Sequence, residues 1–189
     1  MFNWTLLAAQ GGGGSLLPFT PSQSSRRVLS VPAHTWCPAV TYQFQLVAYA
    51  VSVTDARNTH TVTGTAAVAV TQSALVAKIS GGDRLVKDDV PITLVASSSY
   101  DPDFDASAPV NTGCNPARIA FAWNCKLIIN DTIAVSCPFT FTANQATVIL
   151  PANTLSANRV YQFTVAVSTD TRSASDSIRL FTTANIDAR

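Results

Sequence analysis

The segment Ile119-Ala-Phe-Ala-Trp-Asn-Cys125 alternates large apolar side chains with small or polar ones. In an extended strand, Ile119, Phe121 and Trp123 share one face, and the three residues between them share the other. A large aromatic side chain that points between two sheets, with a cysteine close behind it, is typical of a β-sandwich. The segment therefore predicts a central sandwich strand.

An internal repeat relates two parts of the chain at an offset of 119 residues. Val31-Pro-Ala-His-Thr35 resembles Leu150-Pro-Ala-Asn-Thr154, and Tyr42-Gln-Phe44 recurs as Tyr161-Gln-Phe163. Without a gap, six of the 24 positions aligned from Val28 onward are identical, where average composition predicts roughly one or two. Such self-similarity indicates two copies of one structural unit.

The same offset places Phe2 on Phe121 and Trp4 on Trp123, so the chain opens at the counterpart of the strand described above. We therefore expect residues 1–73 to be the C-terminal part of a first module that lacks its leading strands. Residues 74–189 are expected to form a complete second module. The predicted fold is all-β: tandem immunoglobulin-like β-sandwiches, the first incomplete.

Short runs with alternating apolar residues, bounded by Gly, Pro, Asn and Asp, mark the expected strands. In the first module these are residues 2–7, 27–31, 41–51 and 64–71. In the second they are residues 75–79, 92–97, 119–125, 127–129, 147–150, 160–167 and 177–181.

An apolar residue precedes a tyrosine by six positions in both copies, as Trp36 and Tyr42 and as Leu155 and Tyr161. This spacing resembles a tyrosine corner, in which the hydroxyl group ties a turn to nearby backbone. The alternative is that both tyrosines are ordinary half-buried strand residues.

The composition excludes several classes of function. Charged residues make up 12% of the chain and the formal net charge is +1, so no basic surface is expected to bind nucleic acid or an anionic membrane. We expect neither a transmembrane helix nor a secretion signal, because no long apolar run occurs and the first ten residues lack a basic start. His34 and His60 lie in no catalytic motif, so we expect no enzyme activity and no cofactor.

Four cysteines, with no paired C-x-x-C motif, favour disulfides over a zinc site. Cys125 and Cys137 flank a potential short hairpin and are the first pair that we assign. Cys37 and Cys114 then remain, and the loops in which they lie make an interdomain bridge plausible. The alternative for this second pair is two free or intermolecular thiols.

Two acceptor triplets for N-linked sugars begin at Asn3 and Asn130 and agree with an oxidising, secretory compartment. The run Gly11-Gly-Gly-Gly-Ser15 looks like an engineered linker, but the repeat keeps its offset on both sides of the run. A native loop is the preferred interpretation.

Asp101, Asp103 and Asp105 alternate along the chain, and oxygen ligands at alternate positions are how a loop surrounds a calcium ion. The same residues are equally well suited to a turn, because Pro102 fixes its own φ angle and the Asp side chains accept hydrogen bonds from nearby backbone amides. No glycine or closing glutamate completes a calcium loop, so the structural turn is the preferred interpretation.

The second copy carries Val95-Ala-Ser-Ser-Ser-Tyr-Asp-Pro-Asp103, then Phe121-Ala-Trp-Asn-Cys125, and later Tyr161-Gln-Phe-Thr-Val165. These motifs resemble the PKD and REJ (receptor for egg jelly) modules in the ectodomains of polycystin-type and ciliary surface proteins. The Gly-Asp-Gly run of PKD modules is missing after Trp123, so the REJ type is preferred. The resemblance agrees with a bridge from Cys125 to a following cysteine. It implies an extracellular module array and no chemistry.

We therefore expect a non-enzymatic structural or adhesive segment of a large extracellular, cilium-associated surface glycoprotein that acts through protein–protein contacts. Two absent strands would deprive the first module of about 12 kcal/mol of stabilising free energy, if they supplied about six inward side chains at roughly 2 kcal/mol each. A neighbouring module or chain is therefore expected to complete it. The alternative function is a carbohydrate-binding accessory module of a secreted protein, although the three Trp residues occupy positions that predict burial. An ion-sensing role would depend on the Asp cluster.

Overall fold

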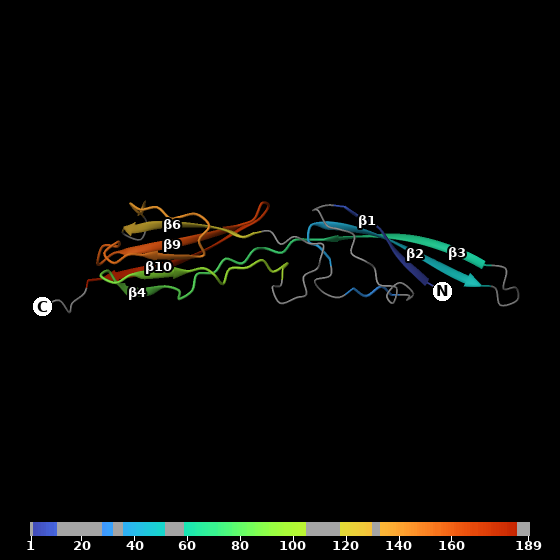
Figure 1. Cartoon of the computed structure of the whole chain (residues 1–189), viewed down its shortest axis with the longest axis horizontal. Coiled ribbons are helices and arrows are strands. Elements are labelled where there is room, and N and C mark those ends of the chain that lie inside the picture. Colours follow the sequence, from blue (N-terminus) through green and yellow to red (C-terminus); the bar gives the residue numbers. More distant parts are fainter. Residues whose placement is uncertain are drawn as a thin grey trace. The chain divides into compact units, whose positions relative to one another are not determined.

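The structure is a computed structural model. It describes residues 2–10, 28–31, 36–51, 59–104, 118–129 and 133–184, and this part of the chain contains ten strands and no helix (Figure 1). The all-β prediction is confirmed. No segment that could cross a bilayer as a helix occurs in the described ranges.

The chain divides into two compact units. The first comprises Met1–Ser73 with Asp103–Pro116, and the second comprises Ala74–Pro102 with Ala117–Arg189. The division between residues 73 and 74 coincides with the expected module boundary, whereas the range that begins at Asp103 groups with the first unit. Both carboxylate oxygens of Asp103 accept the backbone N–H of Ser73, at 3.1 and 3.0 Å.

Two sheets enclose the core of the second unit. The larger has the order β4-β10-β9-β6-β7, and the smaller pairs β5 with β8. In chain order these strands are β4 (Arg84–Lys87), β5 (Ile92–Val95), β6 (Ala120–Ile129), β7 (Ile133–Ser136), β8 (Thr147–Leu150), β9 (Val160–Ser168) and β10 (Ser173–Thr183). Strand β4 is parallel to β10, and the other pairs are antiparallel. This is the sheet arrangement of an immunoglobulin-like sandwich.

Strand β6 places its side chains as the alternation predicts. Trp123 and Cys125 are buried, at 8% and 3% exposure, whereas Ala122 and Asn124 are exposed. The indole N–H of Trp123 donates to the backbone carbonyl of Gln145 at 2.8 Å, so its polar group is satisfied within the core. The other sheet contributes apolar side chains to the same cluster, among them Ile92, Leu94 and Leu150.

The structure corrects several expected strand boundaries. Residues 127–129 continue β6 and are not a separate strand, because all three pair with β7 and the first two also pair with β9. Residues 75–79 form only one bridge, between Val76 and Tyr100. Side chains replace a strand partner there, since Ser99 Oγ accepts the N–H of Lys78 and Asp176 Oδ2 accepts that of Ile79. Residues 28–31 form no strand, and β4 was not expected.

The described part of the first unit contains one antiparallel sheet in the order β1-β2-β3. Its strands are β1 (Phe2–Gln10), β2 (Val40–Val51) and β3 (Thr59–Val70). A small core of Cys37, Val40, Tyr42 and Phe44 lies at one end of β2. Trp36 stacks on Tyr42 with 5.3 Å between ring centroids.

The strand pairs β1–β2 and β6–β9 share one register at the offset of the sequence repeat. Trp4 pairs with Leu46 in the first unit, and Trp123 pairs with Val165 in the second. The correspondence extends from Phe2 to Leu6, and a bulge between Leu6 and Ala8 ends it. The repeat detected in the sequence is therefore also a repeat of strand pairing.

Candidate interaction face of the first unit

The β1-β2-β3 sheet has one apolar side and one polar side. Side chains on neighbouring strands that are directly paired lie on the same side of a sheet. The registers therefore group Phe2, Trp4 and Leu6 of β1, Tyr42, Phe44 and Leu46 of β2, and Val62, Gly64 and Val68 of β3 on one side, which we call the apolar face. The opposite side carries mostly Thr, Gln and Asn, including Asn3, Gln45 and Thr63, with the exposed Tyr49 and Val51 near the end of β2.

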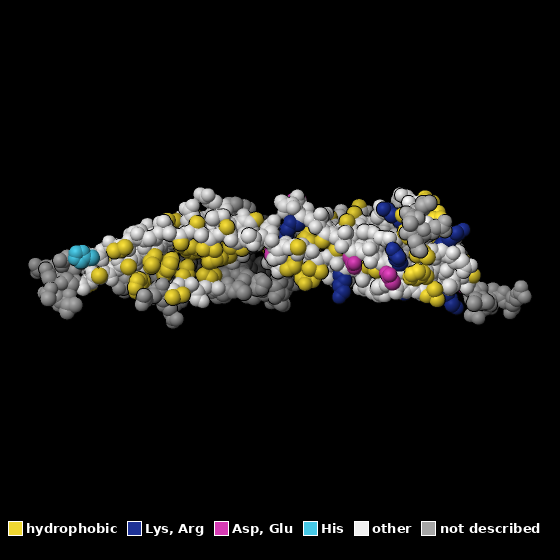
Figure 2. Space-filling view, turned by 180° about the vertical axis from the view of Figure 1, so that it is seen from behind, with side chains coloured by type: hydrophobic (Ala, Val, Ile, Leu, Met, Phe, Trp, Pro, Cys, Tyr) yellow, Lys and Arg dark blue, Asp and Glu magenta, His cyan; other side chains and the backbone are white. Residues whose placement is uncertain are grey.

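The central strand and the edge strand β3 of the apolar face differ in burial. Tyr42 and Phe44 are 1% and 2% exposed, whereas Val68 is 37% and Val62 is 70% exposed. Gly64 lies between the two valines on β3, and a Cβ atom added there would meet no atom within 4 Å. Figure 2 shows hydrophobic side chains gathered at the surface of the first unit, in the left half of the view. The β3 edge therefore leaves apolar side chains exposed on the same side of the sheet as the small core.

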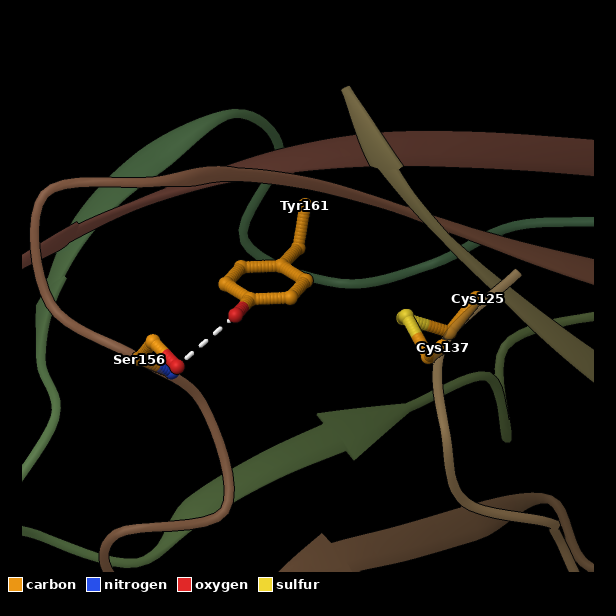
Figure 3. The surroundings of a disulfide bond; sticks show 4 residues. All are labelled: Cys125, Cys137, Ser156 and Tyr161. Carbon is orange, nitrogen blue, oxygen red and sulfur yellow. Dashed lines mark hydrogen bonds between the residues drawn. A yellow bond between two sulfur atoms is a disulfide. The ribbon is translucent and has the colours of Figure 1, made fainter. Parts of the chain in front are cut away.

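A tyrosine corner closes the buried end of each unit. Tyr42 Oη accepts the backbone N–H of Cys37 at 2.8 Å, and Tyr161 Oη accepts that of Ser156 at 3.0 Å (Figure 3). Ser156 is the counterpart of Cys37 at the repeat offset. The predicted corners are confirmed, and they hold the same turn in both units.

The cysteines have structural roles. A disulfide joins Cys125 of β6 to Cys137, just after β7, with 5.4 Å between the Cα atoms, and it lies near the ring of Tyr161 (Figure 3). Cys37 is buried and disulfide-bonded. Its expected partner Cys114 lies outside the described residues, so that pairing stays a prediction. None of the cysteines in the described ranges is free.

Two of the three carboxylates of the candidate calcium cluster make structural contacts. Asp101 is 5% exposed and pairs with Arg172 in the β9–β10 turn, with Nη1 3.0 Å from Oδ1 and Nη2 bound to Oδ2. Asp103 caps the N–H of Ser73, and Asp105 lies outside the described residues. No group of three or more metal-binding side chains occurs in the part of the chain that the structure describes.

The other candidate residues lie on strands or outside the described ranges. Asn3 is exposed on the polar side of β1, where a sugar would be accessible, and Asn130 is outside the described ranges. Trp123 is buried, while Trp4 and Trp36 are half-buried. None of the three indoles is therefore fully exposed.

Sequence reasoning missed Arg172 and the exposed side chains Val62 and Val68. The alternation of Thr with Val and Ala in Thr59–Val70 was a signal that this strand has one apolar side. It could not show that this side is open, because exposure depends on what packs against the strand.

Comparisons with known proteins place the chain in a family. Among solved structures, it is similar to a nucleoside hydrolase-related hypothetical protein from Saccharophagus degradans that is associated with carbohydrate metabolism, at 12% identity and a TM-score of 0.36. The match covers 61% of this chain and 26% of that one, and similarity this low carries no inference. None of the curated proteins matches. The family model described as "REJ domain" matches residues 1–186, across both units, and the chain therefore belongs to the REJ domain family, an extracellular type of module.

Proposed function

We propose that the chain is a non-enzymatic structural and adhesive segment of a cell-surface glycoprotein, and that it acts through protein–protein contacts within a module array. The observation that carries this proposal is the apolar face of the first unit, which exposes Val62 and Val68 along its β3 edge. Exposed apolar side chains beside a buried core on the same sheet are suited to a protein contact.

The polar groups of the described residues support the same function. Asp101 binds Arg172, Asp176 accepts the N–H of Ile79, and Asp83 accepts the N–H of Arg179 at 2.7 Å. Each carboxylate thus holds one segment of the second unit to another. Side chains used in this way contribute to stability and are not poised for catalysis.

Family membership supports an extracellular location, and the exposed Asn3 supports a glycoprotein. Association with cilia is the finer part of the proposal and rests on the resemblance to polycystin-type ectodomains. A tagged form secreted by ciliated epithelial cells should shift in mobility after removal of N-linked sugars. The Asn3→Gln variant should lose part of that shift.

Retention of coated beads on cell surfaces tests the adhesive role. Beads that carry the chain should bind to ciliated epithelial cells, and protease treatment of the cells should abolish binding while glycosidase treatment leaves it unchanged. Beads that carry the reduced, unfolded chain are the control. Equal retention of both kinds of bead would contradict the proposal, and loss of binding after glycosidase treatment would favour the carbohydrate-binding alternative.

A further inference from the structure

We propose that the apolar face, which is exposed along its β3 edge, receives an extended polypeptide segment that pairs antiparallel with residues 28–31 and completes the first sandwich. The occupant is a strand of a partner polypeptide with apolar side chains at alternate positions. This inference rests on the proposed function and names the contact surface.

The second unit shows what covers the corresponding face. There, β5 pairs antiparallel with β8, so that Ile92 lies opposite Leu150 and Leu94 lies opposite Val148. Ile92, Leu94 and Leu150 are 6%, 0% and 4% exposed and belong to the same core cluster as Trp123 of β6. A two-stranded sheet with alternating apolar side chains is therefore the cover that fits this strand pairing.

The first unit contains the counterpart of one covering strand. Residues 28–31 correspond to β8 at the repeat offset, so Leu29 matches Val148 and Val31 matches Leu150. Leu29 packs against the small core, as an inward side chain of such a strand would. No strand pairs with residues 28–31 in the described ranges, so the position that β5 holds in the second unit is open there.

Corresponding positions on β3 and β10 differ in exposure, as expected if the first unit lacks the sheet that packs on the second. Val68 pairs with Tyr42, and Leu180 pairs with Tyr161, so the two occupy corresponding sites on β3 and β10. Val68 is 37% exposed and Leu180 is 0% exposed. The tyrosines themselves are buried in both units. Leu46 of β2 is half-buried, while its counterpart Val165 of β9 is 0% exposed, so the loss of burial includes part of the central strand as well as the third strand.

The occupant is held by apolar contacts and backbone pairing. Gly64 stands where the second unit has Asp176, since Gly64 pairs with Leu46 and Asp176 pairs with the matched Val165. Asp176 accepts the N–H of Ile79 at 2.7 Å, and a glycine offers no such acceptor. The nine residues of the apolar face carry no charge. A strand with charged inward side chains would therefore lose solvation without gaining a partner.

A labelled peptide tests this proposal. The probe copies Asp88–Ser98, which contains β5, and its binding to the intact chain is followed by fluorescence anisotropy. A control peptide carries Ile92→Asp and Leu94→Asp. Saturable binding of the first peptide, at least tenfold tighter than that of the control peptide, is expected, because an aspartate on the inward side would be buried without a partner.

Matched protein variants locate the site. Val62→Asp places a carboxylate on the apolar face, and Thr63→Asp places one on the polar side of the same strand. Both residues are exposed, so neither change should disturb the fold. Val62→Asp should weaken peptide binding at least tenfold, and Thr63→Asp should leave it within twofold.

Three results would overturn the inference. The first is no saturable binding of the β5 peptide, and the second is equal binding by the two variants, which would point to exchange into the second unit. The third is dimerisation of the peptide-free chain, seen by sedimentation and abolished by Val62→Asp, which would put a second copy on the face. Bead retention tests the broader function separately, and it should persist under any of these three results if that function holds.

Discussion

The two units use the same strand pairing and the same tyrosine corner, yet they bury their sheets to different extents. In β9, every second residue from Tyr161 to Val167 is buried. In β2, burial of this alternating kind stops at Phe44, and Leu46 is half-buried. The difference teaches that strand register alone does not create a core, since a sheet becomes buried only where another layer packs against it.

Loss of the buried ion pair should have the largest effect, and only in the second unit. Arg172→Ala leaves the Asp101 carboxylate buried without its cation, and breaking such a pair costs about 3 to 5 kcal/mol. Hydrogen exchange should show amides of β9 and β10 less protected, with those of β2 unchanged. The double variant Asp101→Asn, Arg172→Met should recover much of the stability. Equal loss of protection in both units would contradict the prediction that the ion pair stabilises the second unit alone.

Two leucine truncations compare the covered face of the second unit with the partly exposed face of the first. Leu180→Ala should destabilise the second unit by about 3 kcal/mol, because it leaves a cavity between two sheets. Leu46→Ala should cost about 1 kcal/mol or less in the first unit, since its side chain is already partly in water. Urea unfolding read by hydrogen exchange measures both. A cost for Leu46→Ala as large as that for Leu180→Ala would mean that its face is covered.

Removal of the Cys125–Cys137 disulfide should cost the second unit about 2 to 3 kcal/mol, because the bond closes a short loop that is otherwise free in the unfolded chain. The variant Cys125→Ala, Cys137→Ala should keep its fold and unfold at lower urea concentration. The first unit serves as the internal control, and destabilisation of its amides would contradict the assignment of this bond to the second unit alone.

The smallest predicted effect is one that both units should share. Tyr42→Phe and Tyr161→Phe each remove one hydrogen bond to a backbone N–H, which is worth about 1 kcal/mol. The two costs should agree within about 0.5 kcal/mol when each is measured in its own unit. A much larger cost for one variant would show that the corners are not equivalent.

The parts of the fold that depend on local pattern were predictable. Alternation in residues 119–125 predicted the faces of β6, and the spacing of Trp36 and Tyr42 predicted a hydroxyl-to-backbone bond that the structure contains at 2.8 Å. The pair Cys125 and Cys137 also followed from a local hairpin. Each of these features joins residues on one strand or on neighbouring strands.

Features that join distant segments were not predictable. Arg172 meets Asp101 across 71 positions, and Asp176 reaches Ile79 across 97. Nothing in either neighbourhood marks these partners, because a carboxylate in a turn looks the same whether it binds calcium, an amide or a guanidinium. Residues 75–79 were predicted to form a strand but do not, because distant side chains accept the N–H groups of Lys78 and Ile79 in place of a neighbouring strand.

The sequence by itself determined the strand type, the repeat at 119 residues and the two tyrosine corners, because alternation and spacing set which side chains share a face. Only the tertiary structure decided which faces are covered. Val68 and Leu180 occupy matched positions in similar strands, but one is partly exposed and the other is buried. Burial is a property of the layer that packs against a strand, and that layer comes from elsewhere in the fold.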